Sequence, residues 1–358
     1  MAAEPDFSHM CVWATLSSGI RLERWARGPT KAPFAPAPPP GCGAHGVRRN
    51  VGLVNAAIPA WQLARPPEEA LAWAADAIGA GAKIERLERL TGGGWLASHA
   101  LDVRDRDGVL HPLVLRRWAR PGWEEDPTFT AGNEAAVLNR LERLEPSIPA
   151  PRVIAVTGGH GTGRVPAILL TRLDGRPRPH DVRPPNAAID RLAELLVRIH
   201  AVDDSISEVA PPFQPYYELD RLRAPANARR PDLWARAIEA VQTEPASQRT
   251  TFIHRDYHPG NALWSGGRLT GIVDWTGASW GPPASDMAHL RANLGVDHEP
   301  AVAERAETAY LAAGGQAPDQ RWWDLRTLLD WLPDQGDLAG DDGLARLERY
   351  LAWLLESR

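Results

Sequence analysis

The sequence has few cysteines and lysines and no long apolar run. Its two cysteines, Cys11 and Cys42, are too few for a disulfide framework and do not supply the paired ligands of a structural zinc site. No stretch of about 18 apolar residues is present, and the first residues lack the basic region and apolar core of a signal peptide. We therefore expect a cytoplasmic protein with no membrane partner. Lysine occurs only at Lys31 and Lys83, so arginine supplies nearly all of the positive charge.

The composition is that of a globular protein without excess positive charge. Hydrophobic residues make up 44% of the 358 residues and charged residues 24%, and the formal net charge is -5. A chain of this length usually divides into two lobes or domains, because a single core rarely grows so large. The negative charge gives no reason to expect nucleic-acid binding. A small-molecule substrate is the favoured partner, and nothing in the sequence indicates an oligomeric state.

Residues 1–64 contain no sustained hydrophobic periodicity. The segment 31–46, KAPFAPAPPPGCGAHG, is rich in proline and glycine, which favours an extended or disordered chain. We therefore expect a disordered tail over 1–64, which is either a real appendage or the product of an over-called translation start. Pro66 and Pro67 precede a run that has acidic residues in its first turn, and this pattern predicts a helix at which the folded chain begins.

The remaining chain divides into a strand-rich part over 65–172 and a helix-rich part over 186–358, joined by a linker at 173–185. The first part has short apolar alternations separated by turns, and the second has helical periodicity from Asn186 onward. The run at 84–90 is ambiguous, because its apolar residues follow helical spacing although strand patterns come after it. This organisation predicts an α+β fold.

The segment 252–264, FIHRDYHPGNALW, concentrates polar and titratable residues between apolar runs, as functional loops do. Asp256 and Asn261 stand five residues apart, and Asp274 follows at the end of LTGIVDW. The intervening residues have the form of a hairpin with its turn at 265–267, which could carry Asp274 back beside Asn261. A carboxylate and an amide oxygen suit Mg²⁺, while the second carboxylate can orient a hydroxyl nucleophile. Phosphoryl transfer requires this division of roles.

His254, Asp256 and Asn261 fill the spacing H-x-D-x-x-x-x-N of the protein-kinase catalytic loop. Asp274 falls where the second metal-binding aspartate belongs, but it lies in VDW instead of D-F-G, and no A-P-E follows. Over roughly residues 82–340 the chain resembles the aminoglycoside phosphotransferase family, which also includes choline, homoserine and related small-molecule kinases. The resemblance implies a protein-kinase-like fold with a strand-rich N-lobe that binds ATP, a helical C-lobe, and Mg²⁺ as the metal.

The resemblance also implies roles for the residues of the loop and hairpin. Asp256 would be the catalytic base, and Asn261 and Asp274 would be the magnesium ligands. His254 is expected to pack beneath the loop and bond to the backbone. Asp286, in the helix that follows, either caps that helix or anchors the hairpin loop.

The resemblance further implies a phosphate grip in the N-lobe. Arg116 in LVLRR would hold the nucleotide phosphates, Glu134 in NEAAVLNRL would pair with it, and Gly92, Gly93 and Gly94 would form part of the loop over ATP. These glycines lack the spaced G-x-G-x-x-G pattern and are a weak signal alone.

Arg116 replaces the usual kinase lysine, which leaves two interpretations open. A lost phosphate grip would make the chain a catalytically silent nucleotide-binding relative. Arginine can clamp phosphate with two donors, and this chain uses arginine in place of lysine nearly everywhere, so retained catalysis is the favoured interpretation. The intact set of Asp256, Asn261 and Asp274 also favours it.

The acceptor itself is not identified by the sequence. Eight acidic and three basic residues lie between Asp319 and Glu348. This local charge could attract a cationic amine or sugar, and a solvated helical face explains it equally well. Membership of such a family does not establish antibiotic resistance.

Overall fold

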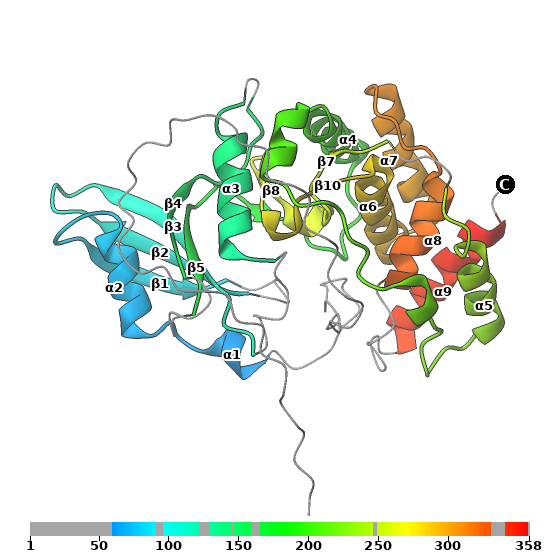
Figure 1. The fold of residues 1–358 in the computed structure, drawn as a ribbon, viewed down its shortest axis with the longest axis horizontal. Helices are drawn as coiled ribbons and strands as arrows, with labels where there is room; N and C mark the ends of the chain where they lie inside the picture. Colours follow the sequence, from blue (N-terminus) through cyan, green and yellow to red (C-terminus); the bar gives the residue numbers. More distant parts are fainter. Residues whose placement is uncertain are drawn as a thin grey trace, which may run out of the picture. The chain divides into compact units, whose positions relative to one another are not determined.

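The computed structural model describes residues 59–90, 96–121, 129–144, 147–158, 165–245, 249–330 and 341–356 (Figure 1). The described residues before the linker form α1 (Ala60–Leu63), α2 (Glu68–Asp76), β1 (Lys83–Arg89), β2 (Ala97–Arg104), β3 (Leu110–Arg117), α3 (Ala131–Leu141), β4 (Val153–Thr157) and β5 (Ala167–Thr171). The later residues form β6 (Arg176–Pro177), α4 (Asn186–His200), α5 (Pro231–Ala240), β7 (Thr251–Ile253), β8 (Ala262–Ser265), β9 (Arg268–Ile272), β10 (Ser279–Gly281), α6 (Pro283–Asp297), α7 (Pro300–Ala312), α8 (Gln320–Asp330) and α9 (Asp341–Glu356).

The strand-rich part is built on a five-stranded antiparallel sheet in the order β1-β2-β3-β5-β4. Successive side chains of a strand point to opposite faces of the sheet, so the partners of alternate residues show what covers each face. In β5, Ala167 and Leu169 pack in one cluster with residues of α2, and Ile168 and Leu170 pack in another with residues of α3. Helices α2 and α3 therefore lie on opposite faces of the sheet (Figure 1).

Helix α3 begins at a side-chain cap and buries one face. The Thr130 hydroxyl accepts a hydrogen bond from the backbone amide of Asn133 at 3.1 Å, which satisfies one of the free donors of the first turn. Val137, Leu138 and Leu141 are buried at helical spacing. The same inward face carries Glu134, so the packing of α3 brings a carboxylate into the interior next to β3.

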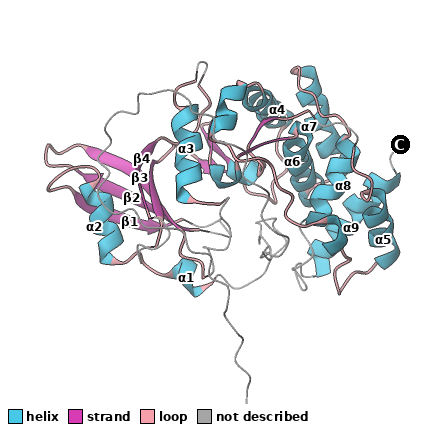
Figure 2. Cartoon of the chain, viewed as in Figure 1, coloured by secondary structure: helices cyan, strands magenta, loops and turns pink. Residues whose placement is uncertain are grey.

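The helix-rich part is organised around α6, whose residues from Pro283 to Val296 are all buried. Helices α7, α8 and α9 contact α6. Two small sheets accompany these helices: β6, β8 and β9 form one, and β7 and β10 form the other. Figure 2 shows the short strands of this part among its helices. The described chain thus has the expected α+β character. None of its described helices combines the length and the apolar character needed to cross a lipid bilayer.

The helices predicted at Pro66 and at Asn186 are present as α2 and α4, and α4 begins behind Pro185 without a side-chain cap. Helix α1 lies before the boundary predicted at residue 65; it contacts β2, and the side chain of Gln62 is buried. The rest of the predicted tail, residues 1–58, lies outside the described residues.

Candidate active site

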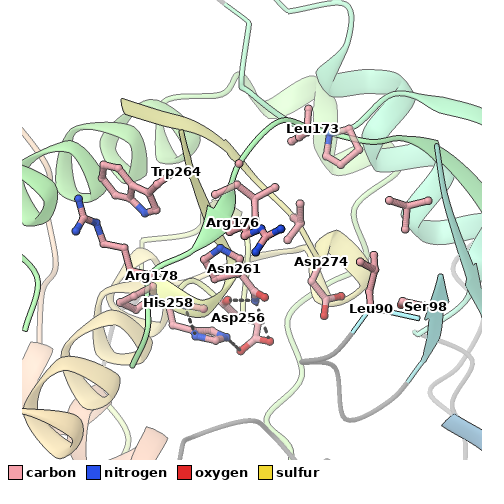
Figure 3. Close-up of a pocket in the computed structure, with 18 of the residues that line it drawn as sticks. Leu90, Ser98, Leu173, Arg176, Arg178, Asp256, His258, Asn261, Trp264 and Asp274 are labelled. Atoms are coloured by element: carbon pink, nitrogen blue, oxygen red, sulfur yellow. Dashed lines mark hydrogen bonds and ion pairs between the residues drawn. The ribbon is translucent and has the colours of Figure 1, made fainter. Parts of the chain in front are cut away.

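The hairpin formed by β8 and β9 places Asp274 next to Asn261, as the sequence predicted. Ala262 pairs with Ile272 in the antiparallel ladder, and the backbone amide of Val273 donates to the carbonyl oxygen of Asn261 at 2.9 Å. The turn uses two glycines with positive φ, at 56° and 78°, which are accessible to glycine at little cost. Figure 3 shows Asp256, Asn261 and Asp274 in one pocket.

Asp256 is held from two sides. The Asn261 amide donates to the backbone oxygen of Asp256 at 2.9 Å, and its Nδ2 lies 3.4 Å from Asp256 Oδ2. On the other side, Nε2 of His258 and Nδ1 of His289 lie 3.8 and 3.7 Å from Oδ1 of Asp256. The Asp256 side chain remains 24% exposed, so a substrate hydroxyl can reach it. His289 belongs to α6 and was missed by the sequence analysis, because no local pattern links it to the loop.

His254 has the structural role expected from the sequence. Its Nδ1 accepts from the backbone amide of Asp256 at 3.3 Å, and its Nε2 donates to the carbonyl oxygen of Val273 at 3.1 Å. The ring centre of His254 lies 4.5 Å from that of Trp275. One buried imidazole therefore connects the loop that carries Asp256 to the strand end that carries Asp274.

Asp286 anchors the backbone of the catalytic loop. Its Oδ1 accepts from the amide of Arg255 at 2.6 Å, and its Oδ2 accepts from the amide of His254 at 2.7 Å. His200 Nε2 lies 3.2 Å from the same Oδ2. Asp286 makes no side-chain cap to α6, so the cap interpretation is wrong. The anchored amides belong to the segment just before Asp256 and not to the hairpin.

A buried ionic cluster joins β3, α3 and the hairpin. Arg116 donates from Nη1 to Glu134 and from Nη2 to Asp274 Oδ1 at 2.5 Å. The Thr276 hydroxyl lies 3.1 Å from Arg116 Nη2, 3.2 Å from Glu134 Oε2 and 3.0 Å from Asp274 Oδ1. Glu134 is only 1% exposed, whereas the side chain of Asp274 is 34% exposed. Asp274 is thus the open member of the cluster, and Thr276 is a member that sequence reasoning did not identify.

The two carboxylates of this cluster have different proton affinities. Burial raises the pKa of Glu134 to about 7, and the Arg116 guanidinium only partly opposes this effect. Burial also acts on Asp274, but there the Arg116 guanidinium prevails and holds the pKa of the carboxyl below its usual range. Asp274 is therefore a carboxylate at neutral pH.

A cavity of about 1370 Å³ lies at these residues. Its lining includes Arg116, Asp256, Asn261 and Asp274, together with 170–176 from β5 and the linker. Ligand pockets usually measure about 300–1,000 Å³, so this space can hold a nucleotide and a second small molecule. The predicted glycine loop, Gly92 to Gly94, lies outside the described residues.

The donor set fits a magnesium ion that is also held by phosphates. Mg²⁺ usually takes one or two protein carboxylates plus substrate phosphate oxygens and water. The Asp274 carboxylate is open to the cavity, and the Asn261 amide turns its nitrogen toward Asp256, which leaves its oxygen available. Within the described chain, no cluster of three or more His, Cys, Asp or Glu side chains forms a ready metal site.

A family model described as the phosphotransferase enzyme family matches residues 89–321 of this chain. Viomycin phosphotransferase of Streptomyces vinaceus is 26% identical over an alignment of 181 residues, and the match covers 45% of this chain and 62% of that protein. The match therefore spans less than two thirds of that relative's length.

The fold is similar to solved phosphotransferase structures. Aminoglycoside phosphotransferase APH(4)-Ia superposes with a TM-score of 0.55 at 18% identity, over 81% of this chain and 98% of that chain. The GDP complex of aminoglycoside 2'-phosphotransferase-IIIa gives a TM-score of 0.56 at 16% identity, over 81% and 98%. With a strand-rich N-lobe and a helical C-lobe, this protein-kinase-like chain belongs to the phosphotransferase enzyme family.

Proposed function

We propose that the chain is a kinase that transfers the γ-phosphate of ATP to a hydroxyl group of a small molecule, with Mg²⁺ as the metal. The observation that carries the proposal is the convergence of Asp256, Asn261 and Asp274 around one cavity that also reaches Arg116. Phosphoryl transfer needs little covalent chemistry from the protein and depends on positioning and charge stabilisation. These four side chains can supply both.

Asp256 would be the catalytic base. Its carboxylate is partly exposed to the cavity and fixed by the Asn261 amide, so it can accept a hydrogen bond from the acceptor hydroxyl and then take its proton. Asp286 and the buried His254 ring accept hydrogen bonds from backbone amides and so hold the segment on which Asp256 lies. These bonds keep the Asp256 carboxylate in place, and they do so through the backbone and not through a second charged group at the acceptor hydroxyl.

Asn261 Oδ1 and the Asp274 carboxylate would hold the magnesium ion, which when bound neutralises charge on the phosphates. Arg116 would bind nucleotide phosphate oxygens at the inner end of the cavity. Gly92, Gly93 and Gly94 would cover the nucleotide. The low proton affinity of Asp274 supports its role as a metal ligand, since a ligand carboxyl must be ionised.

The catalytically silent alternative rests on Arg116 standing where kinases have lysine. Arg116 is bound by Glu134, Asp274 and Thr276, so its charge is fixed at the cavity instead of being lost. A guanidinium in this place can still contact phosphate, because it carries five N–H donors. This geometry supports an active kinase over a nucleotide-binding protein without catalytic activity.

The acceptor is a small molecule with a hydroxyl group, such as an amino alcohol, a sugar or an aminoglycoside-like compound. The relatives act, by their names, on viomycin and aminoglycosides, so such antibiotics belong in any panel of acceptors. The charge argument for a cationic acceptor loses much of its support. Asp324, Asp330 and Glu348 are buried and bonded to Arg291, Arg326 and the Trp234 indole, respectively.

The test is ATP turnover with magnesium and a panel of hydroxyl acceptors, with GTP run in parallel. We expect Asp256→Asn to lower kcat by roughly 10²- to 10⁴-fold with little change in nucleotide binding. Asp232→Asn, at an exposed position in the first turn of α5, is the matched control and should be fully active. Nucleotide binding by the wild-type chain without turnover on any acceptor would favour the silent alternative. Full activity of Asp256→Asn would refute the assignment of the base.

A further inference from the structure

A guanidinium that pairs with no described carboxylate lies in the same cavity, to one side of the catalytic loop. Arg178 follows β6, and its Cζ lies 4.8 Å from the centre of the Trp264 ring. Both side chains line the cavity that contains Asp256 (Figure 3). In the described part of the chain, no ion pair or hydrogen bond engages the Arg178 side chain, and its Nε is a buried donor without an acceptor.

The stacking on Trp264 gives Arg178 a fixed orientation. A guanidinium over an indole face is held by the ring quadrupole and by the loss of water between the two groups. Among the described residues, Trp264 Nε1 is a second buried donor with no acceptor. Buried N–H groups normally have partners, so two neighbouring donors without one at the edge of a cavity favour this place for an external acceptor.

The charges around Arg178 favour an anion. Arg176 and His180, two residues on either side of Arg178, line the same cavity. Asp297, near the end of α6, also lines it, and burial raises the pKa of its carboxyl. The positive charge of Arg346 acts on Asp297, whereas no carboxylate is paired with Arg178 in the described residues. The guanidinium of Arg178 is therefore a cation at this cavity that no described carboxylate neutralises by direct pairing.

We propose that Arg178, stacked on Trp264, binds an anionic group, a carboxylate or a phosphate, of the hydroxyl-bearing acceptor. A planar guanidinium matches the paired oxygens of either group. The acceptor would place its hydroxyl at Asp256 and extend its acidic group toward Arg178 within one continuous cavity. That this ligand is the phosphoryl acceptor rests on the proposed kinase function, but the anion site itself does not.

The first experiment measures anion binding without turnover. Inorganic phosphate is added to the full chain in the presence of Mg²⁺ and a non-hydrolysable ATP analogue, which fills the nucleotide site, and thermal midpoints are compared with sodium chloride of equal ionic strength. We expect phosphate to raise the midpoint of the wild-type chain and of Arg183→Gln, but not that of Arg178→Gln. Arg183 is a matched control because it lies outside the lining and pairs with Glu299.

The second experiment compares three acceptors with one carbon skeleton: glycerate, glycerol and 3-aminopropane-1,2-diol. We expect kcat/KM for glycerate to exceed that for the other two, and Arg178→Gln to lower it by roughly 10- to 100-fold, the usual effect of losing a charge-assisted hydrogen bond. Activity on glycerol and the KM for ATP should not change. Asp297→Asn tests the opposite charge and should leave the preference for glycerate intact.

The outcomes separate the subsite from the kinase proposal. Phosphate binding that depends on Arg178, without turnover of any acceptor, supports the subsite and removes the kinase function. Turnover that prefers the amine, or a phosphate effect that survives in Arg178→Gln, overturns the subsite and leaves the kinase function standing. A preference for glycerate that is lost in Asp297→Asn and not in Arg178→Gln also overturns it.

Discussion

The guanidinium of Arg255 stacks on the ring of Tyr216, with Cζ 4.2 Å from the ring centre. Phe129 and Phe213 lie on other sides of the same guanidinium, at 5.0 and 5.5 Å, and Nη2 donates to the backbone oxygen of Gln214. Arg255 directly precedes the proposed base and has a φ of 68°, in the left-handed region. The Arg255 side chain therefore connects the catalytic loop to Phe129, which lies before α3, and to the segment 213–216.

The positive φ of Arg255 predicts that glycine at position 255 gives a more stable protein than alanine, the reverse of their usual order. Arg255→Gly and Arg255→Ala both remove the ring contacts, but only alanine keeps a Cβ at positive φ. We expect the glycine variant to be more stable by roughly 1–2 kcal/mol in urea unfolding, because the left-handed conformation costs L-residues about that much. Both variants should lose roughly 10- to 100-fold in kcat, since misplacement of a catalytic group is costly. An alanine variant as stable as the glycine variant would contradict the strain.

The parts of the site that are local in sequence could be predicted, because their geometry follows from spacing. The span from His254 to Asn261 and the glycine turn of the hairpin determine which oxygen-bearing groups meet. Thr276 and His289 could not be predicted, because their contacts with Glu134 and Asp256 depend on how α3 and α6 pack. Sequence spacing contains no record of such distances.

The run at 84–90 shows how a local irregularity misleads a periodicity argument. All of it except Leu90 lies in the strand β1, in which Ile84 pairs with Val103 and Leu87 pairs with Leu101. The register shifts between Ile84 and Arg86, as at a β-bulge. The extra residue brings two apolar side chains three positions apart onto the same face, and this spacing is also that of a helix. Only the partner strand resolves the ambiguity.

Asp286 predicts a separation between stability and catalysis. Asp286→Asn keeps the size of the side chain but offers only one oxygen to the amides of His254 and Arg255, so we expect a loss of about 1–3 kcal/mol in stability. We also expect a fall in kcat, because those amides position the loop that carries Asp256. Asp324→Asn is the control: Asp324 is equally buried and bonded to Arg291, away from the loop. If both variants lose stability and keep the same kcat, Asp286 has no positioning role.

Glu134 predicts a pH dependence of stability with a definite sign. Its pKa is about 7 in the folded chain and near 4.5 when unperturbed, so the folded chain binds more protons between these values. Stability is therefore greatest below the lower value, falls as pH rises through the interval, and is constant above it. The full change is at most about 3 kcal/mol. Urea unfolding at about pH 5 and pH 8 should show this decrease in the wild type and a smaller one in Glu134→Gln. Equal decreases would show that Glu134 does not titrate there.

The last prediction concerns where the folded chain must begin. Residues 1–58 lack apolar periodicity, and ordering a backbone costs about 1–2 kcal/mol per residue, which their composition gives little buried surface to offset. We expect a chain that begins at Pro59 to keep the thermal midpoint and ATP turnover of the full chain. A chain that begins at Arg65 lacks α1, which contacts β2 and buries Gln62, so it should lose roughly 1–2 kcal/mol, or a few degrees. Calorimetry of the three chains provides the measurement. If removal of residues 1–58 alone lowers the midpoint or the activity, that segment belongs to the fold, and composition was an unreliable guide to this boundary.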